Sequence, residues 1–231
     1  MTVVLSVICA DGVVVAADTQ ITDSGHGVSY PARKLHALGD RAAWGGSGAR
    51  SVLADVERRF DESATAILES DDIGHALQEQ VLPVLRHHYE HFIEEVPGED
   101  STGSPSAYVL AAGYTDGRAW IFEINPNGMV SRYEDIGFHA IGSGAPMAQQ
   151  AGALLSHFDM TEREVDYGVA ALVRVLDALS LTSPSVGGPL NICRITADGA
   201  EHLDDDEIVA MRKYVERWEE MEQKALDDLF G

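Results

Sequence analysis

The chain has 231 residues, of which 45% are hydrophobic and 23% are charged, so it can bury the core of one large domain or two small ones. Acidic residues outnumber basic ones 38 to 16, which gives a formal charge of −22. Such a surface repels phosphate backbones and anionic lipids, and this argues against nucleic-acid and membrane partners. The longest apolar runs, residues 3–10 and 13–17, are far shorter than the roughly 20 residues of a membrane helix. The first residues lack the basic segment of a signal peptide, so we expect a cytoplasmic protein.

The first half of the chain predicts strands followed by two helices. Residues 3–10 and 13–18 are rich in β-branched side chains, and the Asp11–Gly12 pair between them favours a hairpin turn. Residues 18–30 are rich in Gly, Ser, Thr and Asp and indicate a long surface loop. The remaining expected elements are short strands at 34–38 and 42–46, helices at 49–68 and 72–95, and an exposed link at 97–103.

The second half repeats this order of strands and then helices. Strands are expected at 107–114, 118–125, 130–133 and 137–141, helices at 145–157 and 161–179, a loop at 182–188, a strand at 190–196 and a helix at 206–229. No regular alternation of strand and helix is present, so two antiparallel sheets with a helical pair outside each satisfy the order. We expect one domain, residues 1–231, in which about 206–231 form a C-terminal helical extension.

Thr2 is a candidate nucleophile because of its position. A second-position Thr is small enough for Met1 to be removed, and removal leaves a free α-amine beside the hydroxyl. An alcohol is a weak nucleophile alone, but an α-amine titrates at about 7.7–8.0 and accepts the proton of the hydroxyl at neutral pH. The alternative is an ordinary Thr without a chemical role.

Three further features fit that chemistry. Asp18 is the last residue of a strand that we expect to pair with the strand following Thr2. Lys34 follows a loop that could bring it back beside Asp18. A buried Lys lowers the pKa of a nearby amine, while an Asp keeps the Lys charged and oriented. The glycines of residues 45–48 lie where a strand turns into a helix, and backbone N–H groups there suit an oxyanion. The alternatives are a surface salt bridge and a tight turn.

Together these segments resemble proteasome β-type subunits and their bacterial HslV and Anbu relatives among the N-terminal-nucleophile hydrolases. The resemblance covers nearly the whole chain, at matching separations, and implies an α+β fold, a four-layer αββα sandwich with a C-terminal helix. Its residues are Thr2, Val3 and Val4, the run from Asp11 to Thr19, Lys34, the segment Gly46, Ser47 and Gly48, and the run from His139 to Gly144.

The resemblance implies a role for each site residue. Thr2 would be the nucleophile with its own amine as base, Lys34 would set the pKa of that amine, and Asp18 would partner Lys34. The Gly48 N–H would hold the oxyanion, and Ser143 would orient the amine and a water. Peptide bonds would be cleaved through an acyl-threonine ester.

One stretch departs from the family pattern. The family usually has an Asp and, three residues on, a Ser immediately before a Gly pair. Anchoring on Gly187 and Gly188 places Ser183 at the Asp position and Val186 at the Ser position, a pattern that looks closer to the Anbu branch. Either Ser183 or Ser185 replaces the missing hydroxyl contact to the amine, or nothing does.

The family's pocket positions imply which residues bind the substrate. Ile21, Ala32, Gly46 and Arg50 would line the pocket for the residue before the cleaved bond. Gly46 would leave this pocket open. Arg50 would favour an acidic side chain if it points inward, but it also lies in the first turn of a helix, where an Arg can face solvent.

The resemblance implies a homo-oligomer, either a ring or an open ring that hides the active sites, often served by an ATP-dependent unfoldase. Its substrates would be peptides or unfolded proteins, with no cofactor. Two alternatives stay open. One is a non-catalytic scaffold subunit with Thr2 blocked, and the other is an amidase or transpeptidase that uses the same acyl-threonine.

Three other signals are given structural interpretations. His87, His88 and His91 lie close together, and His87 and His91 are spaced i, i+4, but no zincin pattern accompanies them. We therefore expect all three to be solvated and expect no metal site. Cys9 and Cys193 lie in apolar runs and are expected to be reduced, buried core residues. The apolar stripe of the last helix, from Ile208 to Leu229, packs either on its own domain or on a neighbouring subunit.

Overall fold

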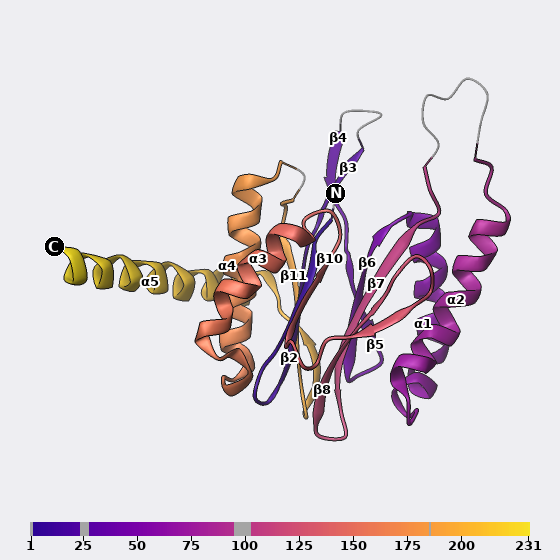
Figure 1. The fold of residues 1–231 in the computed structure, drawn as a ribbon, viewed down its shortest axis with the longest axis horizontal. Helices are drawn as coiled ribbons and strands as arrows, with labels where there is room; N and C mark the ends of the chain where they lie inside the picture. Colours follow the sequence, from indigo (N-terminus) through magenta and orange to yellow (C-terminus); the bar gives the residue numbers. More distant parts are fainter. Residues whose placement is uncertain (1, 24–27, 95–102, 185) are drawn as a thin grey trace.

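The computed structural model describes residues 2–23, 28–94, 103–184 and 186–231. Two five-stranded antiparallel sheets lie face to face, and a pair of helices covers the outer face of each sheet (Figure 1). The predicted four-layer αββα sandwich is therefore confirmed.

The first sheet has the strand order β10-β1-β2-β11-β12. Val4 of β1 lies opposite Ala17 of β2 on one side and Ile141 of β10 on the other. Residues just before β1 are thereby placed between the end of β2 and the segment that follows β10. The strands are β1 (Val4–Ile8), β2 (Gly12–Asp18), β10 (Phe138–Ile141), β11 (Leu190–Thr196) and β12 (Gly199–His202).

The second sheet has the order β5-β6-β7-β8-β9, with every neighbouring pair antiparallel. Its strands are β5 (Leu35–Leu38), β6 (Ala42–Gly48), β7 (Ala107–Thr115), β8 (Arg118–Ile124) and β9 (Val130–Arg132). Apolar side chains from both sheets fill the space between them, among them Val13, Val15, Leu110 and Ile121. Burial of such side chains is the main force that holds two sheets together.

The helices bury apolar faces against the outside of each sheet. The helices α1 (Arg50–Leu68) and α2 (Ile73–Glu90) cover the second sheet, and α3 (Ala145–Leu155) and α4 (Val165–Thr182) cover the first (Figure 1). Every residue of β2 is buried, because this strand has the second sheet on one face and α4 on the other.

The last helix, α5 (Asp205–Phe230), begins with a capping box in which Asp204 and Glu207 bond each other's backbone N–H. Ile208 and Val215 are buried in the same hydrophobic cluster as the buried residues of α4. In addition, Arg174 of α4 donates two hydrogen bonds, of 2.8 and 2.6 Å, to Glu222 of α5. Beyond this point α5 leaves the body of the molecule (Figure 1). The apolar stripe thus packs on its own subunit in its first half, and its remaining apolar residues are exposed: Met221, Leu226, Leu229 and Phe230.

Some predicted elements were wrong. Residues 18–30 contain a two-stranded hairpin, β3 (Gln20–Asp23) and β4 (Val28–Pro31), instead of a loop without strands. The side chains of β4 are exposed, so the apolar alternation that indicates a strand is absent. Strand β12 was missed because its sequence, Gly-Ala-Glu-His, contains no β-branched or large apolar side chain. Most of the expected link at 97–103 lies outside the described residues.

Helix boundaries also differ from the prediction. The helix α2 ends at Glu90, not near residue 95, and α4 begins at Val165, not at residue 161, because residues 160–162 form a short 3₁₀ turn. The Asp11 carboxylate accepts a 2.8 Å hydrogen bond from the Val165 N–H and so fixes the start of α4.

The histidines of α2 are only partly solvated. His87 and His91 are exposed as expected, with ring centroids 4.5 Å apart. His88, however, is half-buried and its Nε2 lies 2.9 Å from an Asp55 carboxylate oxygen on α1. Within residues 2–23, 28–94, 103–184 and 186–231, no three potential metal ligands gather at one place, and no helix is long and apolar enough to span a membrane.

Both cysteines are buried, and burial raises the pKa of each thiol to about 12. At pH 8 only about one such thiol in ten thousand is the reactive thiolate. We therefore expect no adduct when the native protein is treated with iodoacetamide at pH 8, and two adducts in denaturant, measured by intact mass. An adduct on Cys9 or Cys193 in the native protein would contradict their burial.

Candidate active site

Thr2 lies immediately before the central strand β1. Its carbonyl accepts a 3.3 Å hydrogen bond from the Gly144 N–H, and its backbone nitrogen donates to the Ser143 hydroxyl at 3.2 Å. Ser143 is therefore within hydrogen-bond distance of the atom that becomes the α-amine once Met1 is removed.

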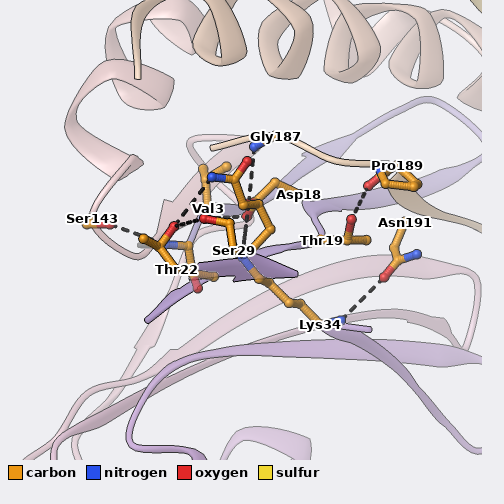
Figure 2. A network of polar contacts seen from close by, with 12 residues as sticks. Val3, Asp18, Thr19, Thr22, Ser29, Lys34, Ser143, Gly187, Pro189 and Asn191 are labelled. Atoms are coloured by element: carbon orange, nitrogen blue, oxygen red, sulfur yellow. Dashed lines mark hydrogen bonds and ion pairs between the residues drawn. The ribbon is translucent and has the colours of Figure 1, made fainter. Parts of the chain in front are cut away.

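Asp18, at the end of β2, joins the start of the chain to Lys34 (Figure 2). One carboxylate oxygen accepts hydrogen bonds from the Val3 N–H at 3.0 Å and from Lys34 Nζ at 2.8 Å, and the other lies 2.9 Å from Nζ. Asp18 is fully buried and Lys34 is 7% exposed, so water screens this pair weakly. The structure brings together the two residues whose pairing the sequence left open.

Hydrogen-bond acceptors around Lys34 partly offset the effect of its burial. In addition to Asp18, Nζ donates to the Gln20 carbonyl at 2.6 Å, and an ammonium group has three N–H donors for such acceptors. Burial lowers the pKa of Lys34 below its ordinary value, while the Asp18 carboxylate opposes this shift. The Lys34 backbone is held by the Asn191 side chain of β11, which accepts from its N–H at 3.3 Å.

The loop that departs from the family pattern contacts the site through its backbone. The Gly187 N–H lies 3.4 Å from the second oxygen of Asp18 (Figure 2). The Gly187 carbonyl accepts hydrogen bonds from the N–H groups of Thr19 and Gln20. Ser183 is buried at the end of α4, and Ser185 lies outside the described residues. A backbone amide thus contacts Asp18, and no side-chain pattern could have indicated it.

Two glycines next to Thr2 have conformations that a side chain would disrupt. Gly48 has a φ of +127°, and a Cβ there would lie 2.1 Å from the Ser106 carbonyl. Gly142 has a φ of +96°, and a Cβ there would lie 2.1 Å from the Thr2 carbonyl. Gly48 ends β6 just before the N-terminus of α1, the positive end of that helix's dipole.

A cavity of about 190 Å³, which we call the first cavity, lies beside this network. It brings together Thr2, Lys34 and Gly48 with the four residues expected to bind the substrate, namely Ile21, Ala32, Gly46 and Arg50. Sequence reasoning missed six further lining residues: Arg33, His36, Trp44, Leu53, Ala54 and Glu57.

The walls of the first cavity carry several charges. The Arg50 guanidinium donates a 2.9 Å hydrogen bond to the Tyr30 hydroxyl of β4, so it lies along the cavity wall although it is exposed. His36 Nδ1 lies 2.7 Å from the Glu57 carboxylate, and burial lowers the pKa of His36 although Glu57 opposes this shift.

The family resemblance implied that Gly46 would leave the first cavity open. The structure shows instead that a neighbouring side chain fills the space beside Gly46. A Cβ at Gly46 would lie 2.3 Å from a terminal methyl group of Leu53, so the Leu53 side chain already occupies that space. Leu53 is three residues after Arg50 on α1, one helical turn away.

A second cavity, of about 850 Å³, also includes Gly48. It extends away from Gly48 over Ser143 toward the start of α3 and the exposed end of β7. Its described lining residues are Ser47, Gly48, Ala49, Ser104, Ser106, Tyr108, Glu123, Ala140, Ile141, Gly142, Ser143, Ala145, Pro146 and Gln149.

Residues 2–193 match the family described as proteasome subunit. Among curated relatives, proteasome subunit beta 1 of Streptomyces avermitilis is 27% identical over 215 residues, covering 89% of this chain and 73% of that protein. Proteasome subunit beta of Archaeoglobus profundus is 24% identical over 213 residues, covering 90% of each chain.

Solved structures of similar fold include two Anbu proteins. An Anbu mutant from Hyphomicrobium sp. strain MC1 superposes with a TM-score of 0.73 at 15% identity, covering 100% of both chains. Anbu, the ancestral beta-subunit, from Yersinia bercovieri superposes with a TM-score of 0.72 at 18% identity, covering 100% of this chain and 98% of that one. At these identities the likeness shows the fold alone.

Replacement of Gly48 by Ala should destabilise the protein more than the same change at Gly117. Both glycines have positive φ, which costs a non-glycine residue about 1–2 kcal/mol, but a Cβ at Gly117 meets no atom within 4 Å. We expect Gly117→Ala to lower the free energy of unfolding by about 1 kcal/mol and Gly48→Ala by more than about 2 kcal/mol, measured by urea denaturation. Equal losses would mean that the close approach to Ser106 is not a constraint.

Proposed function

The chain belongs to the proteasome subunit family, and on this basis we propose that it is an N-terminal threonine peptidase. The proposed reaction is hydrolysis of peptide bonds through an acyl-threonine ester. The observation that carries the proposal is the buried link from the start of the chain through Asp18 to Lys34, beside Thr2 and a cavity.

In the proposed mechanism, Met1 is removed first, and the α-amine of Thr2 becomes the base. The amine takes the hydroxyl proton as Thr2 Oγ1 bonds to the substrate carbonyl carbon, and the Gly48 N–H stabilises the resulting oxyanion. The ammonium then gives its proton to the leaving amine as the C–N bond breaks, which leaves the ester. Water then attacks the ester carbonyl carbon while the amine takes a proton from it. The ester C–O bond breaks, the amine passes this proton to Thr2 Oγ1, and the acid is released.

Lys34 and Ser143 act on the amine in this mechanism. The positive charge of Lys34 disfavours the protonated amine and so lowers its pKa, which keeps a larger fraction in the basic form at neutral pH. Asp18 holds Lys34 charged and orients it. Ser143 accepts a hydrogen bond from the Thr2 nitrogen and thereby directs the amine lone pair toward the hydroxyl.

The first cavity would bind the residue before the cleaved bond, between Ile21, Ala32, Gly46 and Arg50. The guanidinium of Arg50 has N–H groups beyond the one given to Tyr30, and these can bind a carboxylate. We propose acidic side chains as its preferred occupants.

We also propose that the peptidase works in the cytoplasm within a self-compartmentalised homo-oligomer, a ring or an open ring. Family membership supports the assembly, and its enclosed active sites would require unfolded substrates delivered by an ATP-dependent unfoldase.

A non-catalytic scaffold subunit is the second candidate. The departure at residues 183–188 favours it, because a backbone N–H of Gly187 contacts Asp18 in a stretch where the family usually supplies Asp and Ser side chains. In that case Met1 would be retained, and the Thr2 nitrogen would remain an amide without basicity.

Intact mass before and after treatment with a peptide epoxyketone distinguishes the two candidates. The epoxyketone bonds both the hydroxyl and the α-amine of an N-terminal Thr, so we expect loss of Met1 and one adduct on Thr2. Thr2→Ala should give no adduct and no turnover with an unchanged melting temperature, while Thr2→Ser should retain both reactions at a lower rate. Retained Met1 without an adduct, in protein from its native host, would favour the scaffold.

The pH dependence of labelling tests the role of Lys34. Removing its charge raises the pKa of the amine. In a plot of labelling rate against pH, the midpoint of the fall on the acidic side, the acid limb, should therefore move up by about one to two pH units in Lys34→Met. The unpaired Asp18 costs about 3–5 kcal/mol, so folding is checked by circular dichroism. Lys34→Arg keeps the charge and should leave the limb near that of the wild type.

Lys213 on the exposed surface of α5 provides the matched control, and Lys213→Met should leave the limb in place. An acid limb that does not move in Lys34→Met would contradict the role assigned to Lys34.

A further inference from the structure

We propose that the second cavity binds the residues after the cleaved bond and that Glu123 selects a positively charged side chain there. This inference rests on the proposed function and extends it to the leaving-group side of the substrate. It starts from a difference in charge between the two cavities that share Gly48.

The positions of the two cavities relative to Gly48 indicate which part of the substrate each would bind. A peptide whose carbonyl oxygen binds at Gly48 must continue in two directions from the scissile bond. The first cavity contains Lys34 and Arg50, whereas the second contains Ser143 and the start of α3 but neither of these residues. If the acyl part of the substrate fills the first cavity, the leaving part extends over Ser143 into the second.

Glu123 is the one Asp, Glu, Lys, Arg or His side chain among the described residues that line the second cavity. It lies on β8, and its side chain is 15% exposed, so it is largely shielded from water. A carboxylate in such a place attracts a nearby cation more strongly than one on an open surface. The lining of the first cavity instead has three basic side chains, Arg33, Lys34 and Arg50, and one carboxylate, that of Glu57.

Contacts with other side chains hold the Glu123 carboxylate at the wall of the second cavity. The Nε2 atom of His139, on β10, contacts this carboxylate. The Nδ1 atom of the same ring lies 3.0 Å from Nε2 of Gln149 on α3. The ring is also stacked on Tyr133 at a centroid distance of 3.5 Å. Glu123 is therefore fixed in position at the second cavity.

The position of Glu123 beside β10 suits a long side chain. Its partner His139 lies two residues before Ile141, the last residue of β10, which in an extended strand corresponds to about 7 Å. An extended substrate advances about 3.3 Å per residue, and the side chain of Lys reaches roughly 6 Å further. A Lys or Arg at one of the first two positions after the cleaved bond would therefore place its charge near Glu123.

Fluorogenic peptides that differ only in one of these two positions test the proposal, with Lys, Gln or Glu at that position. We expect the wild-type protein to cleave the Lys peptide with a kcat/KM about ten-fold above that of the Glu peptide. The variant Glu123→Gln should reduce this ratio to within about two-fold of unity. Because Glu123→Gln could also disturb His139, Tyr108→Lys provides a second variant: it adds a cation at an exposed lining position and should lower the ratio several-fold.

Glu57→Gln is the matched control, because Glu57 is also a carboxylate held against a histidine, but in the first cavity. It should retain the preference for Lys after the cleaved bond. A wild-type ratio near unity, or a preference that survives Glu123→Gln, would overturn the inference while leaving the peptidase intact. Absence of both turnover and the epoxyketone adduct on Thr2 would overturn the proposed function and, with it, this inference.

Discussion

The buried pair of Asp18 and Lys34 is the interaction on which the rest of the site depends. Two charges removed from water are tolerated only when their hydrogen bonds are satisfied, and here the partners come from residues far apart in the sequence. The Val3 N–H, the Gln20 carbonyl, the Gly187 N–H and the Asn191 side chain all contact this pair or its backbone. The residues just before β1, the start of β3, and β11 with the loop before it are thereby held against the end of β2 and the residue before β5, with Thr2 at the edge.

The sheets add a second constraint that acts through the backbone alone. Gly142 follows β10 and Gly48 ends β6, and both approach a neighbouring carbonyl more closely than any side chain permits. Thr2 is therefore held from the β10 side by Ser143 and Gly144, while Asp18 holds Val3 from the β2 side. Because these contacts use strands in the interior of the fold, they fix the position of Thr2 in the protein without a substrate, which is the condition for electrostatic catalysis by the proposed nucleophile.

Much of the fold could be predicted because its elements bury regular apolar patterns. All strands of the two sheets except β12 were predicted, as were the helices on their outer faces, and the resemblance to a known family indicated that Asp18 pairs with Lys34. The hairpin β3–β4 was missed because its exposed side chains show no such pattern. The contact of Gly187 with Asp18 involves a backbone amide, and the Glu123–His139 pair joins strands of different sheets, so neither has a local signature in the sequence.

The charge of the two cavities is local and does not follow the charge of the molecule. The chain carries −22 overall, yet three of its 16 basic residues line the first cavity. At physiological ionic strength the Debye length is about 8 Å, so the distant acidic surface is largely screened within the cavity while Arg33 and Arg50 act directly on an occupant. In the second cavity Glu123 is the one acidic or basic side chain among the described lining residues. Gly48, which borders both cavities, therefore lies between a surface rich in basic groups and a surface that carries a carboxylate. In the substrate that we propose, the complementary order of charges would favour one direction across Thr2.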